Sequence, residues 1–252
     1  MAAEAPAWVL LHGFAGAPAS WAGVAAELAR HGRVWAPALM GHAHAPVGAR
    51  CFEDEVDRLA AAVADAGLAG AHLGGYSLGA RIGFGLLSRH PQLFSRATLI
   101  GGHPGLAADD PARAERAAAD ERWAKLAESA GAAEFARQWA QQPIFATQAE
   151  LPAQQQATQR AIREAHDGRA LAQAMRVLSL ARMPDWRPHL AGLALPVTLM
   201  VGRRDAKFHA LAQEAQTRLP CSRLLVVEGA GHNTLLEASA AVVSALLEDW
   251  PA

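Results

Sequence analysis

Short runs of apolar residues alternate along the chain with longer segments in which apolar residues recur every three or four positions. The runs are bounded by glycine or polar residues, which is typical of strands buried inside a sheet. The longer periodic segments are typical of helices with one apolar face. The runs predict strands at residues 8–11, 34–37, 71–76, 97–100, 196–201 and 224–227.

This alternation predicts one mostly parallel sheet with helices on both faces, because the strands are apolar along their whole length. Helices are predicted between them at residues 21–28, 52–66, 78–87, about 210–219 and about 235–250. Only seven residues precede the first predicted strand, so we expect the N-terminal strands of the sheet to be reduced.

Residues 109–185, which we name the helical insertion, interrupt the alternation because they contain no convincing strand pattern. Helices are predicted there at about 112–129, 132–141, 153–165 and 170–181, with proline and glycine between them. We therefore expect one domain over 1–252, with a core formed by 1–108 and 186–252. The helical insertion is expected to be a lid on this core rather than a second domain.

Composition excludes several classes of protein. Hydrophobic residues make up 52% of the 252 residues, too many for a disordered chain. The 23 basic and 24 acidic residues nearly cancel, so we expect no nucleic-acid partner. No apolar run reaches the ~20 residues of a membrane-spanning helix, and the first residues lack a signal-peptide pattern, so no membrane insertion is expected. Two cysteines, Cys51 and Cys221, favour a reducing, cytoplasmic location.

The strongest local motif is Gly-Tyr-Ser-Leu-Gly at residues 75–79, between a predicted strand and a predicted helix. It matches G-x-S-x-G, in which a sharp turn lifts a serine hydroxyl clear of the sheet above a helix N-terminus. Small residues are required on both sides because the turn is tight. Ser77 is therefore the candidate nucleophile.

A reactive serine needs a base and an acid that orients the base. Asp205 follows one predicted strand and His232 follows the last, so both lie at the carboxyl edge of the sheet, where ligands bind. The order serine, aspartate, histidine is that of the α/β-hydrolase fold. We predict this fold, with Ser77, Asp205 and His232 as a catalytic triad.

The turn His-Gly-Phe at residues 12–14 follows the first predicted strand. It resembles the segment that supplies one oxyanion-hole amide in this fold, although a simple strand-ending turn has the same pattern. The predicted oxyanion hole consists of the backbone N–H groups of Phe14 and Leu78.

Finer motifs occur at residues 11–14 (LHGF), 75–81 (GYSLGAR), 139–145 (WAQQPIF), 205–208 (DAKF) and 231–233 (GHN). In these motifs, and over nearly its whole length, the chain resembles the 2-succinyl-6-hydroxy-2,4-cyclohexadiene-1-carboxylate synthases of menaquinone biosynthesis. The resemblance implies a lyase that eliminates pyruvate from a succinyl-hydroxycyclohexene dicarboxylate, with Ser77 as base. No cofactor and no metal are expected.

Such a small anionic substrate carries several carboxylates, which arginine binds with planar, bidentate donors. The resemblance implies that three arginines and a tryptophan contact it: Arg81, Arg116, Arg163 and Trp139. Tyr76 is a further candidate because it is the neighbour of Ser77 in the chain. Arg81 lies one helical turn after the serine. Trp139 could equally be helix core with Phe135, and Lys207 could pair with an acid near its loop.

Two other functions use the same residues. A carboxylesterase or a C–C bond hydrolase would employ the triad through an acyl-enzyme or an activated water. A non-catalytic ligand-binding protein would keep the fold alone. Departures from the synthase pattern, such as Arg203 where glutamate is frequent and Thr234 after the last motif, concern the exact substrate more than the triad. The oligomeric state is not predicted.

Overall fold

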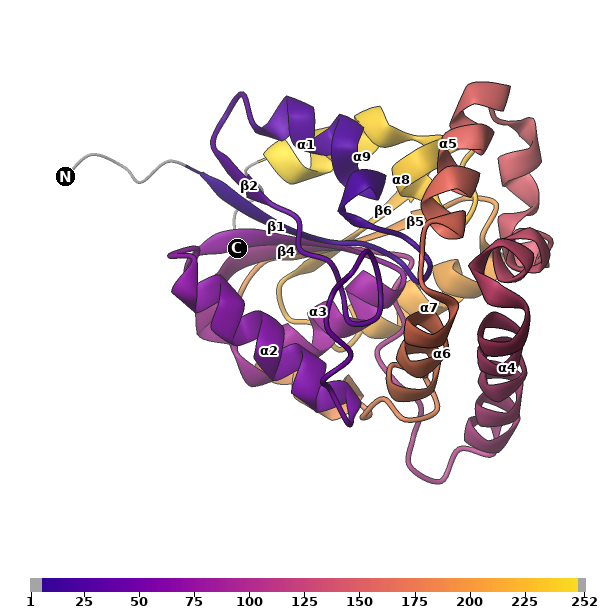
Figure 1. The fold of residues 1–252 in the computed structure, drawn as a ribbon. Helices are drawn as coiled ribbons and strands as arrows, with labels where there is room; N and C mark the ends of the chain where they lie inside the picture. The colour runs from indigo at the N-terminus through magenta and orange to yellow at the C-terminus, as the bar shows by residue number, and fades with distance from the viewer. Residues whose placement is uncertain (1–5, 249–252) are drawn as a thin grey trace.

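The structure, a computed structural model, describes residues 6–248 and contains a single six-stranded sheet (Figure 1). Every neighbouring pair of strands is parallel, in the order β2-β1-β3-β4-β5-β6. The strands are β1 (Ala7–Leu11), β2 (Arg33–Trp35), β3 (Ala71–Tyr76), β4 (Phe94–Ile100), β5 (Val197–Gly202) and β6 (Ser222–Val227). Strand β3 lies between β1 and β4 and is fully buried, so the segment that follows it emerges at the middle of the sheet.

Helices cover both faces of the sheet, as the apolar strands predict. One face carries α1 (Ala22–Leu28), α8 (Thr234–Glu237) and α9 (Ser239–Leu247), and the other carries α2 (Phe52–Asp65), α3 (Leu78–Arg89) and α7 (Ala206–Gln216) (Figure 1). Alternate residues of β1 pack into the two apolar cores, one on each face of the sheet. Trp8 and Leu10 pack with α1 and α9, whereas Val9 and Leu11 pack with α2 and α3.

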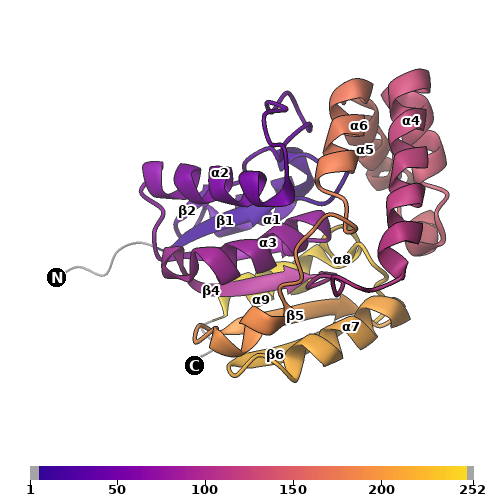
Figure 2. The same ribbon diagram turned by 90° about the horizontal axis from the view of Figure 1, so that it is seen from below.

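The helical insertion joins β4 to β5 and stands beyond the carboxyl end of the sheet (Figures 1 and 2). It contains α4 (Ala112–Trp139), a 3-10 helix (Pro143–Glu150), α5 (Ala153–Glu164) and α6 (Gly168–Val177). It has a small core of its own that includes Phe135, Trp139 and Leu171 and reaches Ala15 of the sheet domain. Within the described residues no strand lies in this segment.

Several predicted element boundaries are wrong, and local capping explains most of the differences. The helix predicted from about 210 begins at Ala206, because the Asp205 side chain accepts the Phe208 N–H and caps it. The helix predicted from about 170 begins at Gly168 for the same reason, with Asp167 as its cap, and ends at Val177 rather than 181.

Other boundaries follow from single backbone conformations. The helices predicted at 112–129 and 132–141 form one element, α4, bent at Gly131, whose φ of 80° is not helical. The predicted last helix is divided into α8 and α9 by Ala238, which has an extended φ of −148°. Its predicted end at 250 lies outside the described residues.

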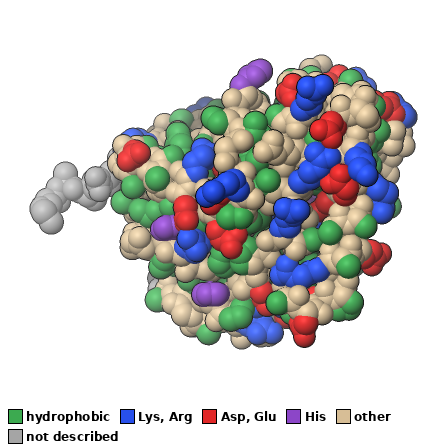
Figure 3. All heavy atoms as spheres, turned by 60° about the horizontal axis from the view of Figure 1, so that its bottom comes forward, with side chains coloured by type: hydrophobic (Ala, Val, Ile, Leu, Met, Phe, Trp, Pro, Cys, Tyr) green, Lys and Arg blue, Asp and Glu red, His purple; other side chains and the backbone are tan. Residues whose placement is uncertain are grey.

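The surface carries both signs of charge. On the face shown in Figure 3, Lys and Arg side chains are intermixed with Asp and Glu side chains rather than gathered into one area. Exposed ion pairs of the described residues include Arg137 with Glu134 and Arg203 with Glu228. Among residues 6–248, no helix is both long and apolar enough to cross a membrane.

Candidate active site

Ser77 occupies the sharp turn between β3 and α3. Its φ of 51° is in the left-handed region, which a serine adopts only when its surroundings impose it. A Cβ on Gly75 would lie 2.6 Å from the Gly79 carbonyl oxygen, and one on Gly79 would collide with the Leu11 carbonyl. The two glycines of the motif are therefore required for the turn to close beneath the serine.

Ser77, His232 and Asp205 lie together in the structure, although they come from three different strand ends. The Ser77 Oγ is 3.1 Å from Nε2 of His232, and the His232 Nδ1–H donates to Asp205 Oδ2 at 2.7 Å. The aspartate and histidine are both buried. Since Nδ1 carries the proton in this arrangement, Nε2 is free to accept the proton of the serine hydroxyl.

Local structure holds the aspartate and histidine in these positions. Asp205 also caps α7, so both of its oxygens are engaged. The His232 ring packs against Phe208, with ring centroids 4.4 Å apart. Glu237 accepts the backbone N–H groups of Gly231 and Asn233, on either side of the histidine. Glu237 was missed by the sequence analysis, because no motif marks a carboxylate that binds only backbone.

Phe14 and Leu78 flank Ser77. Leu78 is the first residue of α3, where backbone N–H groups have no helical acceptor. Phe14 follows the end of β1, and its N–H has no hydrogen-bond partner among the described residues. Neither N–H group has a hydrogen-bond partner among the described residues, and their role as an oxyanion hole stays a prediction.

Two small cavities meet at Ser77. One, of about 190 Å³, is lined by Arg81, Arg116 and Trp139, together with His232. The other, of about 40 Å³, is lined by Tyr76 and Arg163. Every side chain that the sequence analysis assigned to the substrate therefore lines one of the cavities next to the serine. Among the described residues, no cluster of histidine, cysteine or acidic side chains could hold a metal ion.

Arg81 extends from α3 into the larger cavity. Its guanidinium donates to the Leu178 carbonyl at 2.8 Å and has no ion pair with an acidic side chain in the described part of the chain. Burial, and next the neighbouring charge of Arg116, lower the pKa of Arg81 to about 9. The charge of Asp120 opposes this shift in pKa but forms no ion pair with Arg81, so the buried guanidinium favours an anionic ligand.

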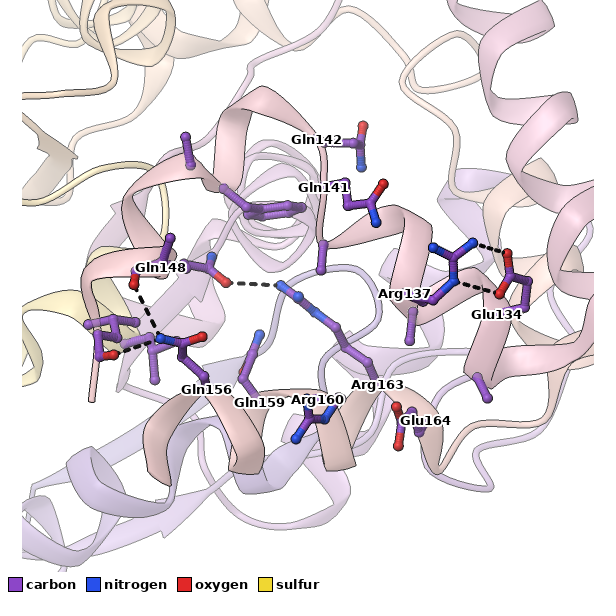
Figure 4. A pocket seen from close by; sticks show the side chains of 18 of the residues that line it. Glu134, Arg137, Gln141, Gln142, Gln148, Gln156, Gln159, Arg160, Arg163 and Glu164 are labelled. Atoms are coloured by element: carbon purple, nitrogen blue, oxygen red, sulfur yellow. Dashed lines mark hydrogen bonds and ion pairs between the residues drawn. The ribbon is translucent and has the colours of Figure 1, made fainter. Parts of the chain in front are cut away.

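Arg163 reaches the smaller cavity from α5 and also borders a third cavity, of about 990 Å³, within the helical insertion (Figure 4). Its guanidinium lies 4.9 Å above the Phe145 ring and donates to Gln148 Oε1. The Nε atom is buried with no partner among the described residues. Burial lowers the pKa of Arg163, while Tyr76 opposes that shift. Arg163 is thus a second buried cation that lacks an acidic partner.

Arg116 differs from these two arginines because it is already paired. Its Nε lies 2.8 Å from both oxygens of Asp120, which is 3% exposed and also accepts the Ser179 hydroxyl at 2.6 Å. Arg116 borders the larger cavity, but Asp120 balances much of its charge.

The two aromatic residues have more than one contact. Trp139 stacks on Phe135 with centroids 5.2 Å apart and also borders the larger cavity, so both roles considered for it are compatible with its position. Tyr76 is buried, and its ring centroid lies 5.5 Å from that of His232. Burial raises the pKa of the Tyr76 hydroxyl, which therefore remains protonated.

Two further residues line the larger cavity. Lys207 is one of its lining residues and forms no ion pair within the described residues, so the suggested pairing with an acid near its loop is not found. His103 follows β4 and is 8% exposed. Burial, and then nearby Arg81, lower the pKa of His103 to about 4, so the ring is neutral. The sequence analysis missed His103, whose only signal is its place after the carboxyl end of a strand.

The chain belongs to the α/β hydrolase fold family, whose sequence profile matches residues 6–239. A 2-succinyl-6-hydroxy-2,4-cyclohexadiene-1-carboxylate synthase from Salmonella heidelberg (strain SL476) is 36% identical over 246 residues, covering 97% of this chain and 93% of the relative. A synthase of the same name from Salmonella newport (strain SL254) is also 36% identical, over 245 residues that cover 96% of this chain and 93% of the relative. Within the fold, the chain therefore belongs to this synthase family, which confirms the resemblance found in the motifs.

Solved structures agree on the fold. MenH from S. aureus superposes with a TM-score of 0.91 at 24% identity, covering 96% of this chain and 92% of that one. The enol-lactonase from Burkholderia xenovorans LB400 gives 0.84 at 21% identity, covering 97% and 90%. Proteins with different reactions thus share this architecture, so the reaction must be argued from the site and from the sequence relatives.

Proposed function

We propose that this chain is a lyase that eliminates pyruvate from a succinyl-hydroxycyclohexene dicarboxylate, giving 2-succinyl-6-hydroxy-2,4-cyclohexadiene-1-carboxylate. The observation that carries this proposal is the 36% identity, over 97% of the chain, to synthases of that product. The two buried arginines without acidic partners support it, because the substrate carries several carboxylates.

In the proposed step, Ser77 Oγ takes a proton from a ring carbon while its own proton passes to Nε2 of His232, 3.1 Å away. The electron pair of the broken C–H bond forms a new ring double bond, and the C–O bond to the pyruvate-derived group breaks. That group takes the proton back from His232 and leaves as pyruvate, so no water is added. Asp205 stabilises the imidazolium that forms in between.

The remaining site residues act by binding charge. Proton removal places negative charge on a carbonyl oxygen of the substrate, and the N–H groups of Phe14 and Leu78 would stabilise it. Arg81 and Arg163 line different cavities, and Ser77 borders both of them, so each arginine would hold a separate carboxylate. In this arrangement the substrate would extend from one cavity into the other past the serine.

We also propose that the helical insertion is a lid on the core, because it contributes Arg116, Trp139 and Arg163 to the two cavities. A cytoplasmic location accompanies the proposed biosynthetic role. The described cysteines, Cys51 and Cys221, are both free thiols, a form that a reducing compartment maintains.

The direct test is pyruvate release from the enzymatically prepared dicarboxylate substrate, followed with a coupled dehydrogenase. We expect turnover by the wild type and loss of turnover in Ser77→Ala. Ser244→Ala, which alters an exposed serine of α9, serves as the matched control and should behave as wild type.

A parallel assay with p-nitrophenyl esters separates the competing functions. Fast ester hydrolysis with no pyruvate release would replace the lyase by an esterase or a C–C bond hydrolase. If neither reaction occurs while the substrate still binds, the chain is a binding protein.

A further inference from the structure

Three buried histidines, His12, His42 and His166, form a column beside the loop that carries Phe14. The ring centroids are 5.1 Å apart between His12 and His42 and 5.3 Å apart between His42 and His166. The first two belong to loops of the sheet core, whereas His166 lies between α5 and α6 of the helical insertion. The column therefore joins the insertion to the core at the active site.

Two hydrogen bonds of this column hold strained backbone. The Ala15 N–H donates to His42 Nε2 at 3.0 Å, and the Ala43 N–H donates to His166 Nδ1 at 3.2 Å. The two alanines have φ values of 56° and 44°, in the left-handed region that residues with a Cβ rarely adopt. Such conformations persist only where the surroundings impose them, and here imidazole acceptors do so.

The column requires neutral imidazoles, because a protonated ring nitrogen cannot accept a backbone N–H. His12 Nε2 likewise accepts the Leu39 N–H at 3.1 Å. Burial lowers the pKa of each member, to about 4 for His12. Neighbouring histidines lower these pKa values further: His166 acts on His12, both of them act on His42, and His44 acts on His166. Backbone hydrogen bonds oppose the shifts without reversing them.

The contacts run without interruption from the helical insertion to the predicted oxyanion hole. His166 binds the N–H of Ala43, the residue next to His42. His42 in turn binds the N–H of Ala15, and its ring contacts the Phe14 ring at 5.1 Å in an edge-to-face arrangement. His166 lies three residues after Arg163, the buried cation that lines the smaller cavity.

We propose that His166 is a positioning residue for the lyase reaction, which fixes the Phe14 amide relative to Arg163 through Ala43 and His42. The expected effect on kcat rests on the proposed function. The structural link between His166 and the Phe14 loop does not depend on that function. A small displacement of an oxyanion donor lowers the rate of the chemical step more than it weakens binding. Loss of this link should therefore lower kcat while KM changes little.

Substitutions at position 166 can separate the hydrogen bond from the presence of a side chain. In His166→Asn the amide Oδ1 takes the place of Nδ1 and still accepts the Ala43 N–H. In His166→Gln the oxygen lies one bond further out and cannot. His166→Ala removes the acceptor altogether, and His31→Ala, at an exposed loop histidine, is the control.

The first measurement is amide hydrogen exchange in the segment 12–16, which needs no substrate. We expect faster exchange in the Ala and Gln variants, near-wild-type exchange in the Asn variant and no change in the control. The second is pyruvate release, for which kcat should fall about tenfold in the Ala and Gln variants and recover in the Asn variant.

Unchanged exchange in a folded His166→Gln variant overturns the proposal, and so does an Asn variant that is as impaired as the Gln variant. If the Ala variant does not fold, the Asn and Gln pair still decides. Failure of the proposed function would give a different result. The wild type would release no pyruvate, but amide exchange would still depend on the acceptor at position 166.

Discussion

The sheet core and the helical insertion supply functional groups in different ways. In the core, backbone geometry places the proposed catalytic residues: Ser77 lies in a glycine-bounded turn, and Asp205 caps a helix while it binds His232. In the insertion, long side chains reach the site from helix surfaces. Arg116 is held there by Asp120, whereas Arg163 is held by an aromatic ring and an amide.

The backbone thus fixes the site residues of the core, whereas side-chain partners fix those of the insertion. A strand end or a helix cap leaves a short side chain few possible positions. The positions of Ser77, Asp205 and His232 are therefore fixed by the backbone. An arginine on a helix can pair with a neighbour or face a cavity, and only its partners decide between these.

Asp205→Asn should give the largest loss of activity. Asparagine can still cap α7, but its amide N–H can donate to Nδ1 of His232. The ring proton then lies on Nε2, which can no longer accept the Ser77 proton. We expect kcat to fall by about 10³-fold or more while Tm changes little. A variant that keeps most of its activity would show that the triad geometry of the core is not used.

Loss of an unpaired arginine should be the next largest effect. Arg163→Gln and Arg81→Gln should each cost about 2–5 kcal/mol of transition-state binding, measured from kcat/KM for pyruvate release. Arg116→Gln is the comparison, and we expect a smaller loss because Asp120 already balances its charge. An equal or greater loss at Arg116 would contradict the distinction drawn between paired and unpaired cations.

Acid should destabilise the core through His12, whose pKa is lowered from 6.5 to about 4 by burial. The unfolded chain binds this proton at a higher pH than the folded chain does. Stability is therefore complete above about pH 6.5 and decreases as the pH falls toward 4, by about 3 kcal/mol for this residue. Urea unfolding at pH 7 and pH 4.5 measures the change, and equal stability at both would remove His12 as its source.

A buried carboxylate of the core should matter more for stability than an exposed one of the insertion. Glu55 is fully buried and accepts the Met40 N–H and the Arg58 guanidinium, so Glu55→Gln should cost about 2 kcal/mol of unfolding free energy. Glu134, paired with Arg137 on the surface, is the matched control, and Glu134→Gln should leave Tm unchanged. A reversed order would indicate that the insertion limits stability.

Much of the core could be predicted because its signals are local. Buried parallel strands are continuous apolar runs, and the G-x-S-x-G turn and the two later strand ends placed Ser77, Asp205 and His232 in the correct chain order. Helix boundaries were less accurate, because caps such as Asp167 and the bend at Gly131 depend on side-chain and backbone conformations that apolar periodicity does not report.

The insertion could be predicted only in outline. Its nine arginines have similar sequence surroundings, and the family resemblance rather than periodicity selected Arg116 and Arg163. Arg116 and Asp120 are four residues apart on α4, a spacing that lets them pair locally. The bond from Ser179 to Asp120 and the burial of Arg163 without an acid depend on contacts between segments far apart in the chain. The histidine column could not be predicted either, since its members are up to 154 positions apart, from His12 to His166.

The sequence by itself determined the order of strands and helices, the α/β-hydrolase fold, the reactive turn at Ser77 and membership of the synthase family. These depend on apolar periodicity and on short motifs, which are properties of neighbouring residues. Only the tertiary structure decided which charges remain unpaired and how the insertion is joined to the Phe14 loop. The burial of Arg81 and Arg163 and the hydrogen bonds between the histidine column and the Phe14 loop are set by residues distant in sequence, which motifs and periodicity do not report.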